Sequence, residues 1–158
     1  MNVWVAAGLI AVVAVAVVVK RLIGEPLNAR DLFGPPLVLT GLGLWALWEV
    51  PDLGGTDLAW VAGGSLLGVG LGVVRGMTIH LFEKEGVLWQ RYTGRTFAVM
   101  AGSALITIGF GALAGRLGMD PQARPVQLSI GVGFLGEALA VGGRGLMSGV
   151  PFAPERRR

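Results

Sequence analysis

Long apolar stretches dominate this chain, and each ends at a charge cluster or at a proline or glycine break. The clearest one carries no charged residue and ends at Lys20 and Arg21. About 18 or more mostly apolar residues are long enough to cross a bilayer as a helix. The chain has five such stretches, at residues 3–19, 34–50, 58–80, 97–115 and 126–148. They predict an all-α fold, a polytopic bundle of five transmembrane helices that forms one domain over residues 1–150, followed by a basic tail at 151–158.

The composition supports a membrane protein. Charged residues make up 15% of the chain, against roughly a quarter in a soluble domain. The 27 glycines would weaken soluble helices but are common where membrane helices approach closely. There is no cysteine, which excludes disulfides, thiolate nucleophiles and cysteine-ligated metals. The basic residues lie at the ends of the apolar stretches, so we expect contact with the lipid bilayer and no nucleic-acid binding.

Charge placement predicts the orientation. With the N-terminus outside, three positively charged clusters fall on the inner side. The only positively charged residues of the outer loops are Arg116 and Arg124. Positive residues favour the cytoplasmic side. The inner clusters are Lys20, Arg21 and Arg30; Lys84, Arg91 and Arg95; and Arg156, Arg157 and Arg158. We therefore expect a retained first helix and an N-out, C-in protein of the bacterial cell membrane.

The loop between the third and fourth stretches is distinctive. Two alternating apolar arms flank the charged turn Glu83-Lys84-Glu85-Gly86. Alternation bounded by a turn is typical of strands, so we predict a short β-like hairpin or interfacial loop on the cytoplasmic side. Trp89, Arg91 and Tyr92 belong to this loop. Its aromatic side chains are expected to anchor it at the inner head groups.

Small residues at four-residue spacing mark helix-packing faces. Residues at i and i+4 share a helix face, and repeated G-x-x-x-G in an apolar helix is a packing signal. The third stretch carries Gly64, Gly68, Gly72 and Gly76, on a line that runs from Trp60 to His80. The fourth carries Ser103, Thr107, Gly111 and Gly115, and the fifth Ser129, Gly133 and Glu137. We expect the third, fourth and fifth helices to form a tight core, with the first two peripheral. The spacing leaves open whether a partner helix comes from the same chain or from a second copy.

Three ionisable residues are expected within or near the bilayer, namely Glu137, Arg75 and Arg144. Buried charges in membranes normally face protein and pair. Glu137 with either Arg75 or Arg144 is a reasonable ion pair. Such a pair could fix helix register, or it could be a polar site open to the cytoplasm in which Glu137 accepts a proton or cation and Arg75 contacts an anion. A protonated Glu137 is the third alternative.

His80 is the only histidine. Without cysteine or a second histidine we predict no metal site and no cofactor. We expect His80 to be an interfacial polar residue, and haem ligation through His80 is a lesser option. No phosphate-binding loop, zinc-protease motif or serine-nucleophile motif is present. Gly131-x-Gly133-x-x-Gly136 matches a dinucleotide fingerprint by letters alone, inside a predicted span without a preceding strand.

Three stretches carry a resemblance to a known family. The first runs from Lys20-Arg21 through Gly24-Glu25-Pro26 to Pro35-Pro36. The second combines Gly68, Gly72, Arg75, Gly76 and Thr78 with the run 85–91, and the third is Glu137 with Arg144. In these the chain resembles the CcdC-like family of small bacterial integral membrane proteins. The family is named from a gene beside cytochrome c biogenesis genes. The resemblance implies no catalytic residues, and the lack of a C-x-x-C motif excludes a thiol role.

Three functions follow from these features. The first is a non-enzymatic membrane module that forms a homo-oligomer, or binds a membrane protein partner or small ligand between the third and fifth helices. The second is a small transporter or channel with a Glu137/Arg75 site. The third is a membrane-embedded enzyme with Glu137 as general acid. This function has the least support, because a single intramembrane carboxylate lacks a second acid, base or metal to act with it.

Overall fold

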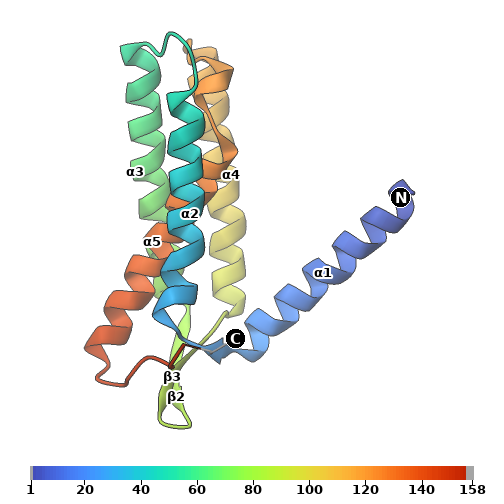
Figure 1. The fold of residues 1–158 in the computed structure, drawn as a ribbon, viewed down its shortest axis with the longest axis vertical. Coiled ribbons are helices and arrows are strands. Elements are labelled where there is room, and N and C mark those ends of the chain that lie inside the picture. The colour runs from blue at the N-terminus through green and yellow to red at the C-terminus, as the bar shows by residue number, and fades with distance from the viewer. Residues whose placement is uncertain (1, 156–158) are drawn as a thin grey trace.

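The computed structural model describes residues 2–155 and consists of five long helices and a small sheet (Figure 1). Arg156, Arg157 and Arg158 of the expected basic tail lie outside the described residues. The helices are α1 Val3–Ile23, α2 Ala29–Trp48, α3 Gly55–Thr78, α4 Gly94–Arg116 and α5 Val126–Met147, with a short 3-10 helix η1 at Pro121–Ala123. The strands are β1 Glu25–Pro26, β2 His80–Lys84 and β3 Val87–Arg91.

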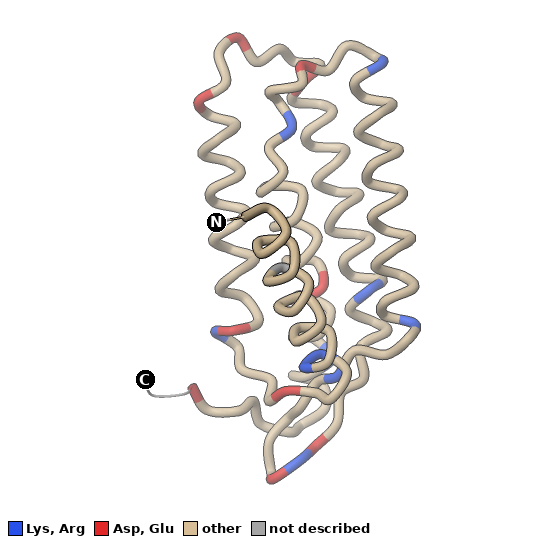
Figure 2. The backbone as a smooth tube through the Cα atoms, turned by 90° about the vertical axis from the view of Figure 1, so that its right-hand side faces the viewer, with Lys and Arg blue, Asp and Glu red and all other residues tan. Residues whose placement is uncertain are grey.

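Four segments are long and apolar enough to cross a membrane, namely α1, α3, α4 and the η1–α5 segment Pro121–Met147. The chain is therefore a candidate multi-pass membrane protein, with four of the five expected spans. The remaining helix, α2, has 20 residues and lies along the bundle (Figure 1). Asp31, Pro35 and Pro36 lower its apolar content. Charged residues gather at the two ends of the bundle and on the hairpin (Figure 2).

The tight core consists of α2, α3 and α5, because α5 packs extensively on both α3 and α2 while α4 packs mainly on α3. The expectation of a core from α3, α4 and α5 with α2 peripheral is wrong. Glycines explain the difference: a Cβ at Gly131 of α5 would lie 2.5 Å from the backbone nitrogen of Thr40 in α2. A Cβ at Gly43 of α2 would overlap Leu128 of α5 in the same way. The two backbones thus touch, which needs glycine on both helices.

The second helix also begins earlier than expected. The second apolar stretch predicts a helix from residue 34, but α2 starts at Ala29 and includes Pro35 and Pro36. The Asn28 side chain caps this start by accepting hydrogen bonds from the backbone nitrogens of Arg30 and Asp31, at 2.8 and 3.4 Å. A cap of this kind satisfies donors that the first helical turn leaves free.

The expected hairpin is confirmed and belongs to a three-stranded antiparallel sheet in the order β1-β3-β2. Glu85 and Gly86 form its turn with φ of 56° and 75°, the positive values that tight hairpin turns require and glycine adopts without strain. The edge strand β1, paired through Glu25 and Gln90, was not foreseen. Beyond α5, the Pro151 carbonyl oxygen accepts a hydrogen bond of 2.9 Å from the Leu88 backbone nitrogen.

Two buried clusters hold the two ends of the bundle. At the sheet end, the cluster comprises Leu27, Ile79, Leu88, Tyr92 and Val141. At the opposite end, which we call the loop end, it comprises Leu47, Ala114, Met119, Ala123, Leu128 and Val132. Helix α1 leaves the sheet end and points away from the bundle (Figure 1), with none of its apolar window buried. Its exposure agrees with the peripheral position expected of the first helix.

Candidate functional site: a buried charge centre

The buried charge centre is built on an ion pair between α5 and α3. Glu137 lies in the middle of α5 and Arg75 in the last turn of α3, and they are 6% and 8% exposed. The Arg75 Nε donates to the Glu137 Oε2 across 62 residues of sequence. Of the two partners considered for Glu137, the structure forms the pair with Arg75.

Tyr92 completes the centre. Its hydroxyl donates to the other carboxylate oxygen of Glu137, Oε1, and the residue is 3% exposed. It directly follows β3 and precedes α4, outside the helices. Burial raises the pKa of the Tyr92 hydroxyl, and the charge of Glu137 and the hydrogen bond to it raise the pKa further. The hydroxyl therefore stays protonated and remains a donor at neutral pH.

The expected role of Tyr92 as an anchor at the head groups is wrong, because a residue enclosed by protein cannot contact head groups. Arg21, at the end of α1, lies over the tyrosine ring with its Cζ 5.1 Å from the ring centroid. The Arg21 carbonyl oxygen also accepts a 2.8 Å hydrogen bond from the Tyr92 backbone nitrogen. One available signal was that Tyr92 is the only tyrosine, at the point where an amphipathic strand enters an apolar helix.

Arg144 does not pair with Glu137. Its Nη1 donates to the carbonyl oxygens of Gly76 and Ile79, at 2.7 and 2.8 Å. The last carbonyls of a helix lack intrahelical partners and carry partial negative charge. Arg144 therefore caps the C-terminal end of α3 from α5, and it strengthens the same helix contact that the ion pair makes.

Arg75 has a buried nitrogen without a partner among the described residues. Its guanidinium lies over Phe134, with Cζ 4.8 Å from the ring centroid. The Nη2 atom is buried and makes no hydrogen bond with any described residue. An unpartnered donor in the interior is uncommon, so Nη2 is a buried point of the centre with unused binding capacity.

The α3 glycine line closes the helix interface around the ion pair. A Cβ at Gly72 would overlap the Gly133 carbonyl oxygen, and one at Gly76 would lie 2.7 Å from the Ala140 Cβ. A Cβ at Gly68 would lie 2.8 Å from Val132. Three glycines of the line that predicted a packing face, Gly68, Gly72 and Gly76, thus pack on α5 of the same chain, whereas Gly64 faces Phe110 of α4.

His80 lies apart from the centre. The third stretch predicts that the helix continues to His80. The helix α3 ends at Thr78 instead, so His80 is the first residue of β2. Its ring is exposed and stacks on Phe82 with 5.6 Å between centroids. Within residues 2–155, no group of three or more His, Cys, Asp or Glu side chains is placed to hold a metal ion.

His80 belongs to a face of the hairpin that also carries the half-buried Trp89 and the exposed Arg91. The strand register pairs Phe82 with Trp89 and His80 with Arg91. Arg91 lies over the Phe82 ring at 5.9 Å, and Lys84 lies over Trp89 at 4.5 Å. We call His80, Phe82, Lys84, Trp89 and Arg91 the cation–aromatic face. Of the predicted loop residues, Trp89 and Arg91 lie on this outward face, whereas Tyr92 points into the protein.

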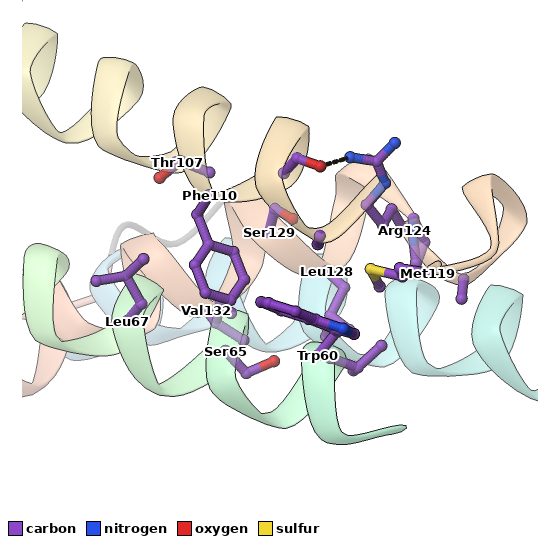
Figure 3. Close-up of a pocket in the computed structure, with 16 residues that line it drawn as sticks. Trp60, Ser65, Leu67, Thr107, Phe110, Met119, Arg124, Leu128, Ser129 and Val132 are labelled. Carbon is purple, nitrogen blue, oxygen red and sulfur yellow. Dashed lines mark hydrogen bonds between the residues drawn. The ribbon is translucent and has the colours of Figure 1, made fainter. Parts of the chain in front are cut away.

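The small residues of α4 line a cavity instead of a tight helix contact (Figure 3). Thr107 and Gly111 face it from α4, and Gly64 faces it from α3. The cavity has a volume of about 70 Å³ and lies at the loop end. Ser103 is buried, and its hydroxyl has no partner among the described residues. The α4 ridge therefore leaves space beside α3 where close packing was expected.

No protein-family model, curated protein or solved structure matches the chain. The resemblance to CcdC-like proteins accordingly stays a prediction from the three sequence stretches that carry it.

Proposed function

We propose that this protein is a non-enzymatic membrane module in which the buried charge centre holds the sheet and the α2–α3–α5 core in one fixed arrangement. The module acts at the cytoplasmic side through a second copy in a homo-oligomer or through a different membrane protein. In this proposal α2 spans the membrane beside the four apolar segments, and the sheet lies at the inner surface.

The observation that carries the proposal is the set of donors on Glu137. One oxygen accepts from Arg75 of α3 and the other from Tyr92 at the end of the sheet. A carboxylate in a low-dielectric interior is favoured only when such donors surround it. Each element of the centre therefore depends on the other two, so the sheet cannot move away from the bundle without exposing an unpaired charge.

The cation–aromatic face supports a binding role at the sheet. Its cations are exposed at the end of the bundle where positive charge marks the predicted cytoplasmic side. Aromatic and arginine side chains are enriched at binding surfaces. Gly68, Gly72 and Gly76 of α3 are covered by α5, so association with a partner has to use a surface other than the one these glycines suggested.

Distance measurements between spin labels test the fixed arrangement. The chain has no cysteine, so Glu83→Cys in β2 and Gln122→Cys in η1 place one label at each end; both residues are exposed. We expect a narrow distance distribution in the parent and a broader one after Glu137→Gln or Tyr92→Phe. The exposed Glu155→Gln is the matched control and should leave the distribution narrow. A broad distribution in the parent, or no change in both variants, would contradict the proposal.

A transporter that uses Glu137 and Arg75 is the second candidate, and the unpartnered Arg75 Nη2 is the observation that favours it. A small anion could bind there if the helices parted. Flux of chloride or protons into proteoliposomes should then be present in the parent and absent in folded Glu137→Gln and Arg75→Gln protein. The module proposal expects equal flux in the parent, in both variants and in protein-free liposomes.

A further inference from the structure

The cavity at the loop end is separate from the charge centre. Trp60, Phe110, Met119 and Leu128 form its apolar walls, contributed by α3, α4, the loop between α4 and η1, and α5 (Figure 3). The rings of Trp60 and Phe110 meet edge to face, with 5.4 Å between centroids. Neither Arg75, Glu137 nor Tyr92 lines it. Its occupant is therefore a question distinct from the role of the ion pair.

The size of the cavity restricts what can enter it. Its volume of about 70 Å³ is well below the ~300 Å³ of a small pocket for a whole ligand. It exceeds the ~10–15 Å³ that one water needs, but its walls are mostly apolar. Because α4 packs on α3 and hardly touches α5, the cavity is partly open at the bundle surface. A short length of hydrocarbon chain entering from the surrounding lipid fits these conditions.

Arg124 lies at the rim of the cavity with no carboxylate in ion-pair range among the described residues. Its Nη1 donates to the carbonyl oxygen of Gly111 (Figure 3). A guanidinium has five N–H donors in a planar fork that matches phosphate, so most of them are free. Gly111 lies five residues before the end of α4 at Arg116, about 7.5 Å along the helix axis. This places the free cation inside the helix end, at a depth suited to a lipid head group.

Two glycines give the cavity its shape. A Cβ at Gly111 would lie 3.0 Å from the Arg124 Nη1, and one at Gly64 would lie 3.1 Å from the Phe110 ring. Side chains at these positions would displace the cation and the aromatic wall. The cavity thus explains why small residues occur on helix faces that do not pack closely.

We propose that this cavity is a binding site for an anionic phospholipid of the adjoining leaflet. Part of one acyl chain occupies the cavity beside Trp60 and Phe110, and the negatively charged head group binds the free donors of Arg124. The opposite charges of the guanidinium and the head group, and the apolar walls beneath them, together select this occupant. The site does not depend on the proposed module function.

Native mass spectrometry in mild detergent tests the head-group contact. The protein is mixed with phosphatidylglycerol or with phosphatidylcholine of the same acyl chains. We expect the parent to retain phosphatidylglycerol over phosphatidylcholine by roughly fivefold, as one arginine near a membrane surface contributes. Arg124→Gln should lose this preference. The matched control Arg116→Gln, at the same end of the bundle but away from the cavity, should keep it.

The acyl contact needs its own variant. Thr107→Phe should fill the cavity and lower retention of both lipids at least severalfold, with the thermal midpoint of each variant confirming that it is folded. Added inorganic phosphate should not displace the lipid. Equal retention of the two lipids by the parent, an unchanged preference in Arg124→Gln, or displacement by phosphate alone would each overturn the proposal, as would full retention by a folded Thr107→Phe protein.

Discussion

The Tyr92 hydroxyl donates a hydrogen bond to the Glu137 carboxylate, and so connects the end of β3 to the middle of α5 across 45 residues. The same carboxylate accepts from Arg75 of α3. The Glu137 side chain therefore contacts both α3 and the residue that follows the sheet strand β3. This contact extends the centre beyond a two-helix ion pair, because it joins the residue that follows β3 to both α3 and α5.

Removing either member of the ion pair should destabilise the protein strongly. We expect Arg75→Gln and Glu137→Gln each to lower the free energy of unfolding by about 3 kcal/mol, because each leaves a buried charge without its partner. The double variant should lose less than the sum of the two. Denaturant unfolding in detergent measures this coupling.

The exposed Glu83→Gln on the hairpin serves as the control and should change the unfolding free energy by less than about 0.5 kcal/mol. Additive losses in the double variant would show that Arg75 and Glu137 do not interact energetically, against the contact in the structure.

Tyr92 should make the protein sensitive to alkaline pH. Its pKa is raised in the folded state, so between the ordinary tyrosine value near 10 and the raised one the folded protein keeps a proton that the unfolded chain releases. The contribution of Tyr92 is fully present below pH ~10 and is lost as the pH rises further. Thermal stability of the parent should therefore fall more steeply above pH 10 than that of Tyr92→Phe. Parallel curves for the two proteins would be incompatible with a raised pKa.

Glycines on the same helix should differ sharply in their tolerance of alanine. A Cβ at Gly72 would overlap the backbone of α5, whereas one at Gly70 would meet nothing within 4 Å. We expect Gly72→Ala to cost about 1–3 kcal/mol or more through overpacking. Gly70→Ala should be neutral or stabilising by up to ~1 kcal/mol, since alanine favours helix.

Thermal unfolding of the two alanine variants in the same detergent makes the comparison. If both variants melted at the same temperature, the close approach of α3 and α5 would not exist in the folded protein.

The predicted N-out, C-in topology is testable with single cysteines, since the chain has none of its own. In sealed cells a membrane-impermeant maleimide should label Gln122→Cys in η1 and should reach Glu83→Cys in β2 only after the membrane is opened. The reverse pattern would invert the orientation and place the cation–aromatic face outside. Labelling of both positions in sealed cells would contradict a multi-pass arrangement with the sheet and η1 on opposite sides.

Much of the fold could be predicted from the sequence because its signals are local. Apolar length indicated the long helices, and the alternating arms around Glu85-Gly86 indicated the hairpin. Arg75 and Glu137 could be named because a charge within an apolar stretch is costly and therefore must be paired. The position of α2 could not be predicted. Its sequence is interrupted by prolines, and nothing in it indicates that Gly43 packs against α5.

What the sequence by itself determined is therefore which segments are apolar, where they break and which residues are too polar to be left alone in the interior. Only the tertiary structure decided that Glu137 pairs with Arg75, that Arg144 caps α3 and that Tyr92 points inward. It likewise decided that Gly68, Gly72 and Gly76 of α3 pack on α5, while Gly64 of α3 and Gly111 of α4 border a cavity. The physical reason is that four-residue spacing defines a helix face but not its partner. The rotation and depth of each helix are set by which backbones can approach and which buried donors and acceptors can meet.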